Sequence, residues 1–369
     1  MKDFTCPYCY ETHDWKSIRL QCKYQQKLDL CCRDVVKDAS GFIPDKDKKT
    51  CLKCKYGSLG VFCPNGRVPQ KIPPDYQNGE NLTVALMGAK ASGKSNYIGV
   101  LVQEIINSMS EPFNCFLNTT VSTESNKYYH DNYYRPLYEA QSVIGATSAN
   151  AIPPLLFPLF FKKQMAALTF YDTAGENMKD IETMEAANNY IRNAKGLIVL
   201  LDPLQIDSVR EKLKGKVPLP DKDTNISEVL TNLFNVLMSS NKIKLKKGKI
   251  PIPIAVTFTK IDALETEGVD LLSEDSYLRS ESLHLARGAF VKNDFAAVQR
   301  ELRTILRDEV AEGGSINAVM QKFENYAFFG VTALGKVPNG MRLSGRVEPR
   351  RVLDPLLWIL SVNKYIKTI

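Results

Sequence analysis

Long apolar runs are missing from this chain of 369 residues. No stretch reaches the roughly 20 consecutive apolar residues that a membrane-spanning helix needs, and the most apolar window, 152–161, is short and interrupted by prolines. The segment 1–10, MKDFTCPYCY, also lacks the apolar centre of a secretory signal peptide. These absences predict a cytoplasmic protein without a membrane span.

A strong excess of one charge is also missing. The net charge is +7, and 44% apolar with 24% charged residues is the composition of an ordinary globular protein. Such a charge permits an anionic partner, whether nucleotide, nucleic acid or membrane surface, without requiring one. The lysine-rich run at 242–249 is interpreted as a basic loop that extends into water.

Cysteine is nearly absent beyond residue 63, where only Cys115 occurs. The other eight are Cys6, Cys9, Cys22, Cys31, Cys32, Cys51, Cys54 and Cys63. The pairs at 6–9 and 51–54 have a two-residue gap, which lets a tight turn direct both sulfurs to one tetrahedral ion. A disulfide framework suits secreted proteins, and a thioredoxin-type pair needs a βαβ context. The cysteines therefore predict one or two zinc sites, with their pairing open and His13 as a possible substitute ligand.

The cysteine-rich region ends in a stretch, 64–80, that is rich in Pro, Gly and Asn and cannot continue a helix or a central strand. We expect a zinc-binding module at 1–65, a linker at 66–80 and a larger domain at 81–369. Inserts in the larger domain are expected near 110–150, 204–250 and 265–325.

A phosphate-binding loop follows the expected linker. An apolar strand at 82–88 precedes GAKASGKS, which matches G-x-x-x-x-G-K-S, and 96–109 has helical apolar spacing. Glycines let backbone N–H groups curl round a phosphate, and the helix N-terminus adds its positive end. Lys94 would reach the β- and γ-phosphates, while the Ser95 hydroxyl would ligate Mg²⁺. The expected nucleotide contacts are Gly88, Ala91, Ser92, Gly93, Lys94, Ser95 and Asn96.

A second strand-like run ends at Asp172, which would lie beside the phosphate loop and hold Mg²⁺ through water. Gly175 follows three residues later, where its backbone N–H could bond a γ-phosphate. Because that bond exists only while the γ-phosphate does, the arrangement predicts a switch.

Three motifs together resemble those of Ras-like P-loop GTPases of the TRAFAC type. The run 172–176, DTAGE, is similar to the switch motif, 259–262, TKID, to the base-reading motif, and 332–334, TAL, to the loop after the next strand. They occur in the family's order, each after a strand-like run. The resemblance implies an α/β fold, with a mostly parallel sheet and helices on both faces, that binds GTP or GDP with Mg²⁺.

The resemblance also assigns roles in reading the base. The aspartate of the family accepts two hydrogen bonds from guanine N1 and N2, where adenine has no donors, so Asp262 would select guanine. Lys260 would lie along the base, and the Ala333 N–H would meet guanine O6. Thr259, Thr332 and Leu334 complete the expected set, and Thr259 departs from the commoner Asn.

Two further positions bear on hydrolysis. The resemblance implies a Mg²⁺-binding threonine before the strand at 155–161; Thr147 is our choice, with Thr119, Thr120 and Thr123 as further candidates. Glu176 stands where many members have a glutamine that orients the attacking water. A glutamate cannot donate to the γ-phosphate. We therefore expect slow hydrolysis that a partner completes.

The carboxyl-terminal stretch 348–366, the strand end at 200–203 and the cysteine-rich front also resemble double-GTPase-type proteins of bacterial conflict systems. The first hypothesis is a GTPase switch that recruits a protein partner, with Lys94, Thr147, Gly175 and Glu176 in the catalytic site. Two competing hypotheses are a weakly hydrolysing, nucleotide-bound assembly scaffold and a zinc-ribbon nucleic-acid binder regulated by nucleotide. Nucleic acid is not favoured, because 1–65 shows no aromatic and basic interleaving. A further hypothesis, an ATPase, is disfavoured because Asp262 is expected to select guanine over adenine.

Overall fold

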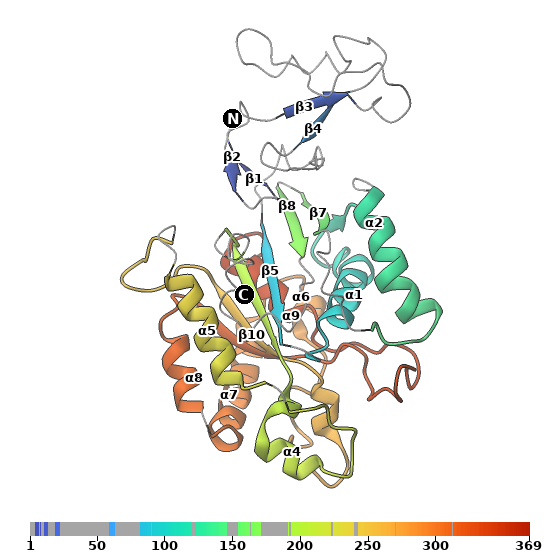
Figure 1. Cartoon of the computed structure of the whole chain (residues 1–369), viewed down its shortest axis with the longest axis vertical. Coiled ribbons are helices and arrows are strands. Elements are labelled where there is room, and N and C mark those ends of the chain that lie inside the picture. The colour runs from blue at the N-terminus through green and yellow to red at the C-terminus, as the bar shows by residue number, and fades with distance from the viewer. Residues whose placement is uncertain are drawn as a thin grey trace. The chain divides into compact units, whose positions relative to one another are not determined.

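The computed structural model divides into two compact units, Met1–Asn81 and Leu82–Ile369 (Figure 1). The structure describes residues 4–6, 8, 11–13, 19–22, 59–62, 82–89, 91–119, 123–145, 154–162, 164–170, 191, 193–222, 224–239, 243–269, 271–311 and 313–369. No helix within these ranges is both long and apolar enough to cross a bilayer.

The described residues of the first unit form two small antiparallel sheets. β1 (Phe4–Thr5) pairs with β2 (Thr12–His13), and β3 (Arg19–Cys22) pairs with β4 (Leu59–Phe62). A two-stranded hairpin buries little apolar surface and is marginally stable in water. The described strands of this unit therefore do not by themselves supply a hydrophobic core.

A parallel sheet forms the centre of the second unit, in the order β11-β10-β9-β5. Its strands are β5 (Val84–Gly88), β9 (Gly196–Leu201), β10 (Ile254–Phe258) and β11 (Tyr326–Gly330). Every residue of β5, β9 and β10 is buried. Strands that are apolar on both faces require cover on both sides, which accounts for the helices that flank the sheet.

An antiparallel meander extends this sheet beyond β5. It consists of β6 (Cys115–Leu117), β7 (Leu155–Phe161) and β8 (Met165–Phe170). A parallel bridge between Thr83 and Thr169 places β8 beside β5. The predicted α/β class with a mostly parallel sheet is confirmed.

Helices cover the two sides of the sheet. They are α1 (Lys94–Glu104) with its π-helical extension η4 (Ile105–Met109), α2 (Thr123–Tyr129) with η5 (His130–Glu139), η7 (Pro203–Gln205), α4 (Asp207–Leu213), α5 (Ile226–Met238), η8 (Ile261–Glu265), α6 (Leu283–Arg287), α7 (Lys292–Glu309), α8 (Gly313–Met320) and α9 (Asp354–Val362). In Figure 1, α5, α7 and α8 lie on one side of the sheet, and α1 and α2 lie on the other.

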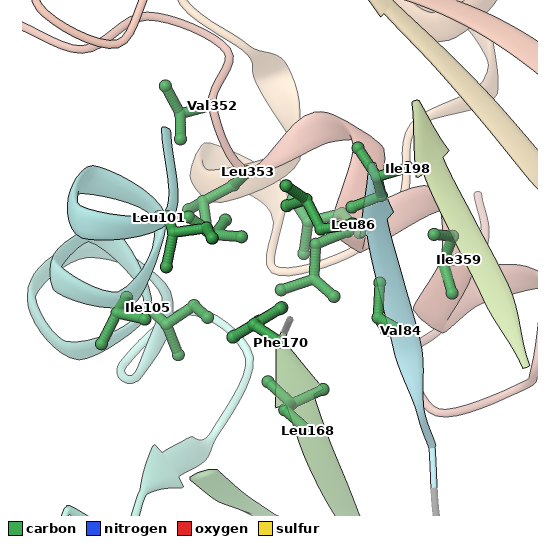
Figure 2. Packing of buried hydrophobic residues seen from close by; sticks show 14 of the residues in the cluster. Val84, Leu86, Leu101, Ile105, Leu168, Phe170, Ile198, Val352, Leu353 and Ile359 are labelled. Atoms are coloured by element: carbon green, nitrogen blue, oxygen red, sulfur yellow. The ribbon is translucent and has the colours of Figure 1, made fainter. Parts of the chain in front are cut away.

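The core between α1 and the sheet is shown in Figure 2, where Leu86 and Phe170 from two strands point toward Leu101 of α1. Ile359 of α9 belongs to the same cluster. A Cβ at Gly196 would lie 2.5 Å from the Ile359 side chain, so this glycine lets α9 approach the start of β9 closely. Close packing of this core holds α1 against the strands from which the phosphate loop emerges.

A buried cluster of charges fixes the start of α9. The two terminal nitrogens of Arg351 donate to the Asp294 carboxylate at 2.9 and 3.0 Å, and Nη1 also donates to Asp354 at 2.8 Å. His284 lies beside them, and within the described part of the chain the ligand atoms of His284, Asp294 and Asp354 are close enough together to hold a metal ion. The Arg351 guanidinium forms ion pairs with both carboxylates, so this group is a structural ion cluster that ties α7 to α9.

Candidate nucleotide site

The predicted phosphate loop is a tight turn between β5 and α1. Ala91 and Gly93 have φ angles of 61° and 77°, and the N–H of Ser92 donates to the Ala89 carbonyl at 3.1 Å. The left-handed residues turn the chain so that α1 begins at Lys94. The N–H groups of a helix N-terminus attract an anion, so this end of α1 is suited to a phosphate.

The first glycine of the loop is required by packing. A Cβ at Gly88 would lie 2.4 Å from Ser92 Oγ and 3.2 Å from the Leu200 Cβ. A side chain there would push the loop away from β9 and spoil the turn that presents α1.

A cavity of about 560 Å³ opens beside this loop, within the range typical of small-molecule sites. From the predicted set, its lining includes Ala91, Ser92, Gly93, Lys94, Ser95, Asn96, Thr259, Lys260, Asp262, Ala333 and Leu334. Lys94 and Ser95 are buried. The structure thus brings the predicted phosphate and base residues to one cavity, across more than two hundred positions of sequence.

Thr259 links the loop after β10 to the predicted phosphate loop. Its hydroxyl donates to the Ser92 carbonyl at 2.8 Å, and it also lies 3.2 Å from the Leu201 carbonyl. Thr259 is buried. The side chain that differs from the commoner asparagine therefore joins the two loops by one hydrogen bond.

Lys260 is held by a residue that the sequence motifs did not identify. Its Nζ lies 2.6 Å from Oδ2 of Asp202, whose side chain is 1% exposed, and Oδ1 of Asp202 accepts from the Leu204 N–H at 2.9 Å. The sequence signal that could have identified Asp202 is its position as a charged residue directly after the wholly apolar strand β9. Because a buried carboxylate needs a cation, Asp202 fixes the Lys260 side chain beside the cavity.

Asp262 lines the cavity with Lys260 and Ala333, and its backbone N–H donates to Thr332 Oγ1 at 3.1 Å. Burial raises the pKa of Asp262, while hydrogen bonds from its own backbone and Thr332, with the charges of Arg350 and Lys260, act against that rise. A carboxylate accepts hydrogen bonds from two N–H groups only when ionised. Acid therefore impairs this acceptor more readily than it would an exposed aspartate.

Arg350 stabilises the loop that carries Thr332, Ala333 and Leu334. Thr332 and Arg350 exchange two backbone hydrogen bonds of 3.0 and 2.8 Å, and the Arg350 side chain forms an ion pair with Glu265. These contacts hold the predicted O6 reader, Ala333, at the cavity.

The predicted switch residues lie outside the described residues. They are Thr147, Asp172, Gly175 and Glu176, together with the candidate Thr120. Of the other candidates, Thr119 follows β6 and does not line the cavity, and Thr123 begins α2. The expected contacts of the switch residues with Mg²⁺ and γ-phosphate stay predictions.

Most of the predicted zinc ligands also lie outside the described residues, namely Cys9, Cys31, Cys32, Cys51, Cys54 and Cys63. Cys22 ends β3, and His13, the possible substitute ligand, is buried at the end of β2. Cys6 is buried, and its Sγ accepts from the Tyr8 N–H at 3.4 Å. Cys115 is buried in the second unit, where burial raises the pKa of its thiol to about 11.

No family model matches this chain. A protein of Mycolicibacterium smegmatis described as "Putative ESX-1 scaffolding and assembly protein SaeC" is 29% identical over 313 residues, which cover 79% of this chain and 77% of that protein. Among solved structures, the Arl6 BBS3 small GTPase from Trypanosoma brucei, bound to the nucleotide analogue GppNp, is similar at 12% identity and a TM-score of 0.34. That match covers 78% of this chain and 99% of the small GTPase.

Proposed function

We propose that this protein binds guanine nucleotides with Mg²⁺, hydrolyses GTP slowly and acts as a switch that recruits a protein partner. The cavity carries the proposal, because a phosphate-type loop at a helix N-terminus and the partly buried Asp262 line the same hollow. Neither feature alone would indicate a guanine-nucleotide site.

The phosphates would bind at the start of α1. The Lys94 ammonium would neutralise the β- and γ-phosphates, while backbone N–H groups of the 91–95 turn would bond their oxygens. Ser95 is buried at the helix start, and with Asp172 and Thr147 it would give the oxygen donors that Mg²⁺ prefers. The ion would add positive charge against the phosphate oxygens.

The base would bind at Asp262. An ionised Asp262 can accept from both N1 and N2 of guanine, whereas adenine offers no donor at the matching atoms. Lys260, fixed by Asp202, would lie along the ring, and the Ala333 N–H would bond O6.

Slow hydrolysis follows from Glu176. A carboxylate in the glutamine's place accepts from water but cannot donate to the γ-phosphate. Intrinsic turnover in this class can be on the order of 10⁻⁴ per second, and an arginine supplied by a partner adds roughly 10³–10⁵. A partner that completes the site is therefore part of the proposal.

Competition for bound tritiated GDP tests the proposal. With Mg²⁺, GTP and GDP should displace the label about a hundredfold better than ATP, roughly 2.7 kcal/mol. Asp262→Ala should lose this preference, and Asp308→Ala, which removes an exposed aspartate, should keep it. Equal competition by ATP on the unaltered protein would show that the cavity does not read guanine.

A nucleotide-bound assembly scaffold is the second candidate, and the related M. smegmatis protein favours it, since that protein's description names scaffolding and assembly. The two candidates differ in turnover. Phosphate release from one loaded equivalent of GTP supports the switch, whereas intact GTP that still exchanges with free nucleotide supports the scaffold.

The basic run does not favour nucleic acid. Lys246 and Lys249 close a tight turn through backbone hydrogen bonds of 2.8 and 3.0 Å, and 244–249 are exposed. Lys246 pairs with Glu324 at 2.6 Å. Exposed lysines of this kind extend into water, as the composition predicts.

We further propose that the cysteines of the first unit bind one or two zinc ions. The N–H of Tyr8 donates to Cys6 Sγ, an arrangement that suits a sulfur carrying negative charge. Structural zinc supplies folding energy that small hairpins lack. Thiol ligands persist in a reducing compartment, so the expected cytoplasmic location belongs to this proposal.

Removal of metal provides the test for zinc. Elemental analysis should find zinc in the purified protein, and the double variant Cys6→Ser/Cys9→Ser should lower the amount per chain. Cys115→Ser removes a buried thiol elsewhere and should retain the full content. A chelator should unfold the first unit, as followed by proteolysis. Protein that carries no zinc after growth in zinc-supplemented medium would overturn the proposal.

A further inference from the structure

An apolar wall borders the cavity on a segment that none of the sequence motifs includes. The wall consists of residues 217–220, Val-Pro-Leu-Pro, all of which line the cavity. Val217, Leu219 and Pro220 are partly exposed, and Pro218 is exposed. Four apolar side chains with water-accessible surface at the edge of one hollow are suited to cover an apolar surface of a ligand.

The wall is fixed at both ends. Arg210 of α4 donates from Nη1 to the carbonyls of Leu204 and Pro220, both at 2.9 Å. The amide of Gln205 donates to the Asp221 carbonyl at 3.0 Å, and the N–H of Val217 donates to the carbonyl of Leu213 at 3.3 Å. Prolines inside the wall restrict its φ angles as well. The wall is therefore preorganised, which lowers the entropy that a ligand must overcome.

A relay of contacts places the wall next to Lys260. The Lys260 ammonium pairs with Asp202, and Asp202 accepts from the N–H of Leu204. The carbonyls of Leu204 and Pro220 both accept hydrogen bonds from Nη1 of Arg210. Leu204 itself lines the cavity. The wall thus lies on the side of the cavity where the base-reading lysine is held.

The chemistry of the wall excludes the phosphates as its occupant. Phosphate oxygens need N–H groups and cations, which Lys94 and the start of α1 provide. Valine, leucine and proline side chains offer neither. The remaining part of a nucleotide is the nucleoside, whose ring faces and ribose carbons are apolar.

We propose that the wall packs against the nucleoside half of the bound guanine nucleotide and slows its release, with Arg210 as the positioning residue. This inference rests on the proposed guanine-nucleotide binding. Without a ligand, the wall's side chains contact water, and a nucleoside beside them would remove that surface from water. Contacts made only in the bound state act mainly on the dissociation rate.

Dissociation of tritiated GDP from the full-length protein tests the wall. Val217→Ser/Leu219→Ser should release GDP about tenfold faster, which corresponds to the loss of roughly one covered apolar side chain. The association rate and the thermal midpoint without nucleotide should stay as in the unaltered protein. Leu245→Ser, which changes a 44% exposed leucine in the lysine-rich turn, should leave both rates unchanged.

Arg210 provides an independent readout. Arg210→Ala should also accelerate GDP release, and Arg210→Lys should restore slow release, since an ammonium can donate to the same two carbonyls. If the unaltered protein binds GDP and Val217→Ser/Leu219→Ser releases it at the same rate, the proposed role of the wall is wrong but the proposed function stands. An unaltered protein that binds no guanine nucleotide would overturn both this inference and the proposed function.

Discussion

Replacement of Lys94 by alanine is expected to weaken GTP binding by about a thousandfold. Hydrogen bonds that involve a charged group each contribute roughly 1.5–3 kcal/mol, and the proposed ammonium meets two phosphates, so a loss of about 4 kcal/mol follows. The Lys94 side chain is buried at the start of α1, where a phosphate would remove most of its remaining contact with water.

Calorimetry with a non-hydrolysable GTP analogue measures this loss. Lys94→Met keeps the aliphatic stem and serves as the second variant, so that a packing defect can be separated from the loss of charge. Lys249→Ala, in the exposed lysine-rich turn, is the matched control and should bind as the unaltered protein does. Nucleotide affinity that survives in Lys94→Met would mean that the 88–95 turn does not bind phosphate.

Arg351→Ala is expected to lower the free energy of unfolding by about 3–5 kcal/mol, which is the usual cost of removing one partner of a buried ion pair. Burial opposes the charge of Arg351, but hydrogen bonds to Asp294 and the charges of Asp354 and Asp294 outweigh it and raise the pKa of the guanidinium. The cation is therefore present at every pH at which the protein is studied. Without it, two buried carboxylates lack their counterion.

Denaturant unfolding followed by circular dichroism measures this loss. Arg307→Ala removes an exposed arginine paired with Asp308 and should unfold like the unaltered protein. Equal stability of Arg351→Ala and the unaltered protein would contradict the structural role of the cluster.

The α/β class and the loop before α1 could be predicted from the sequence because both depend on neighbouring residues. Apolar runs of strand length, glycines where the backbone must turn left-handed, and helical spacing after Lys94 all lie within a short stretch. That Asp262 and Ala333 line one cavity was also predictable, because each follows a buried strand. Parallel strands of one sheet bring such carboxyl ends to one edge.

The sequence alone therefore determined where nucleotide chemistry is to be sought, since that information is carried by local motifs. The tertiary structure decided which distant groups support it. Asp202 reaches Lys260 across 58 positions, and the Thr259 hydroxyl reaches the Ser92 carbonyl across 167. Arg210 holds the wall only because α4 turns back on the segment that follows it. No local pattern encodes such contacts, because they depend on where packing of the core places each element.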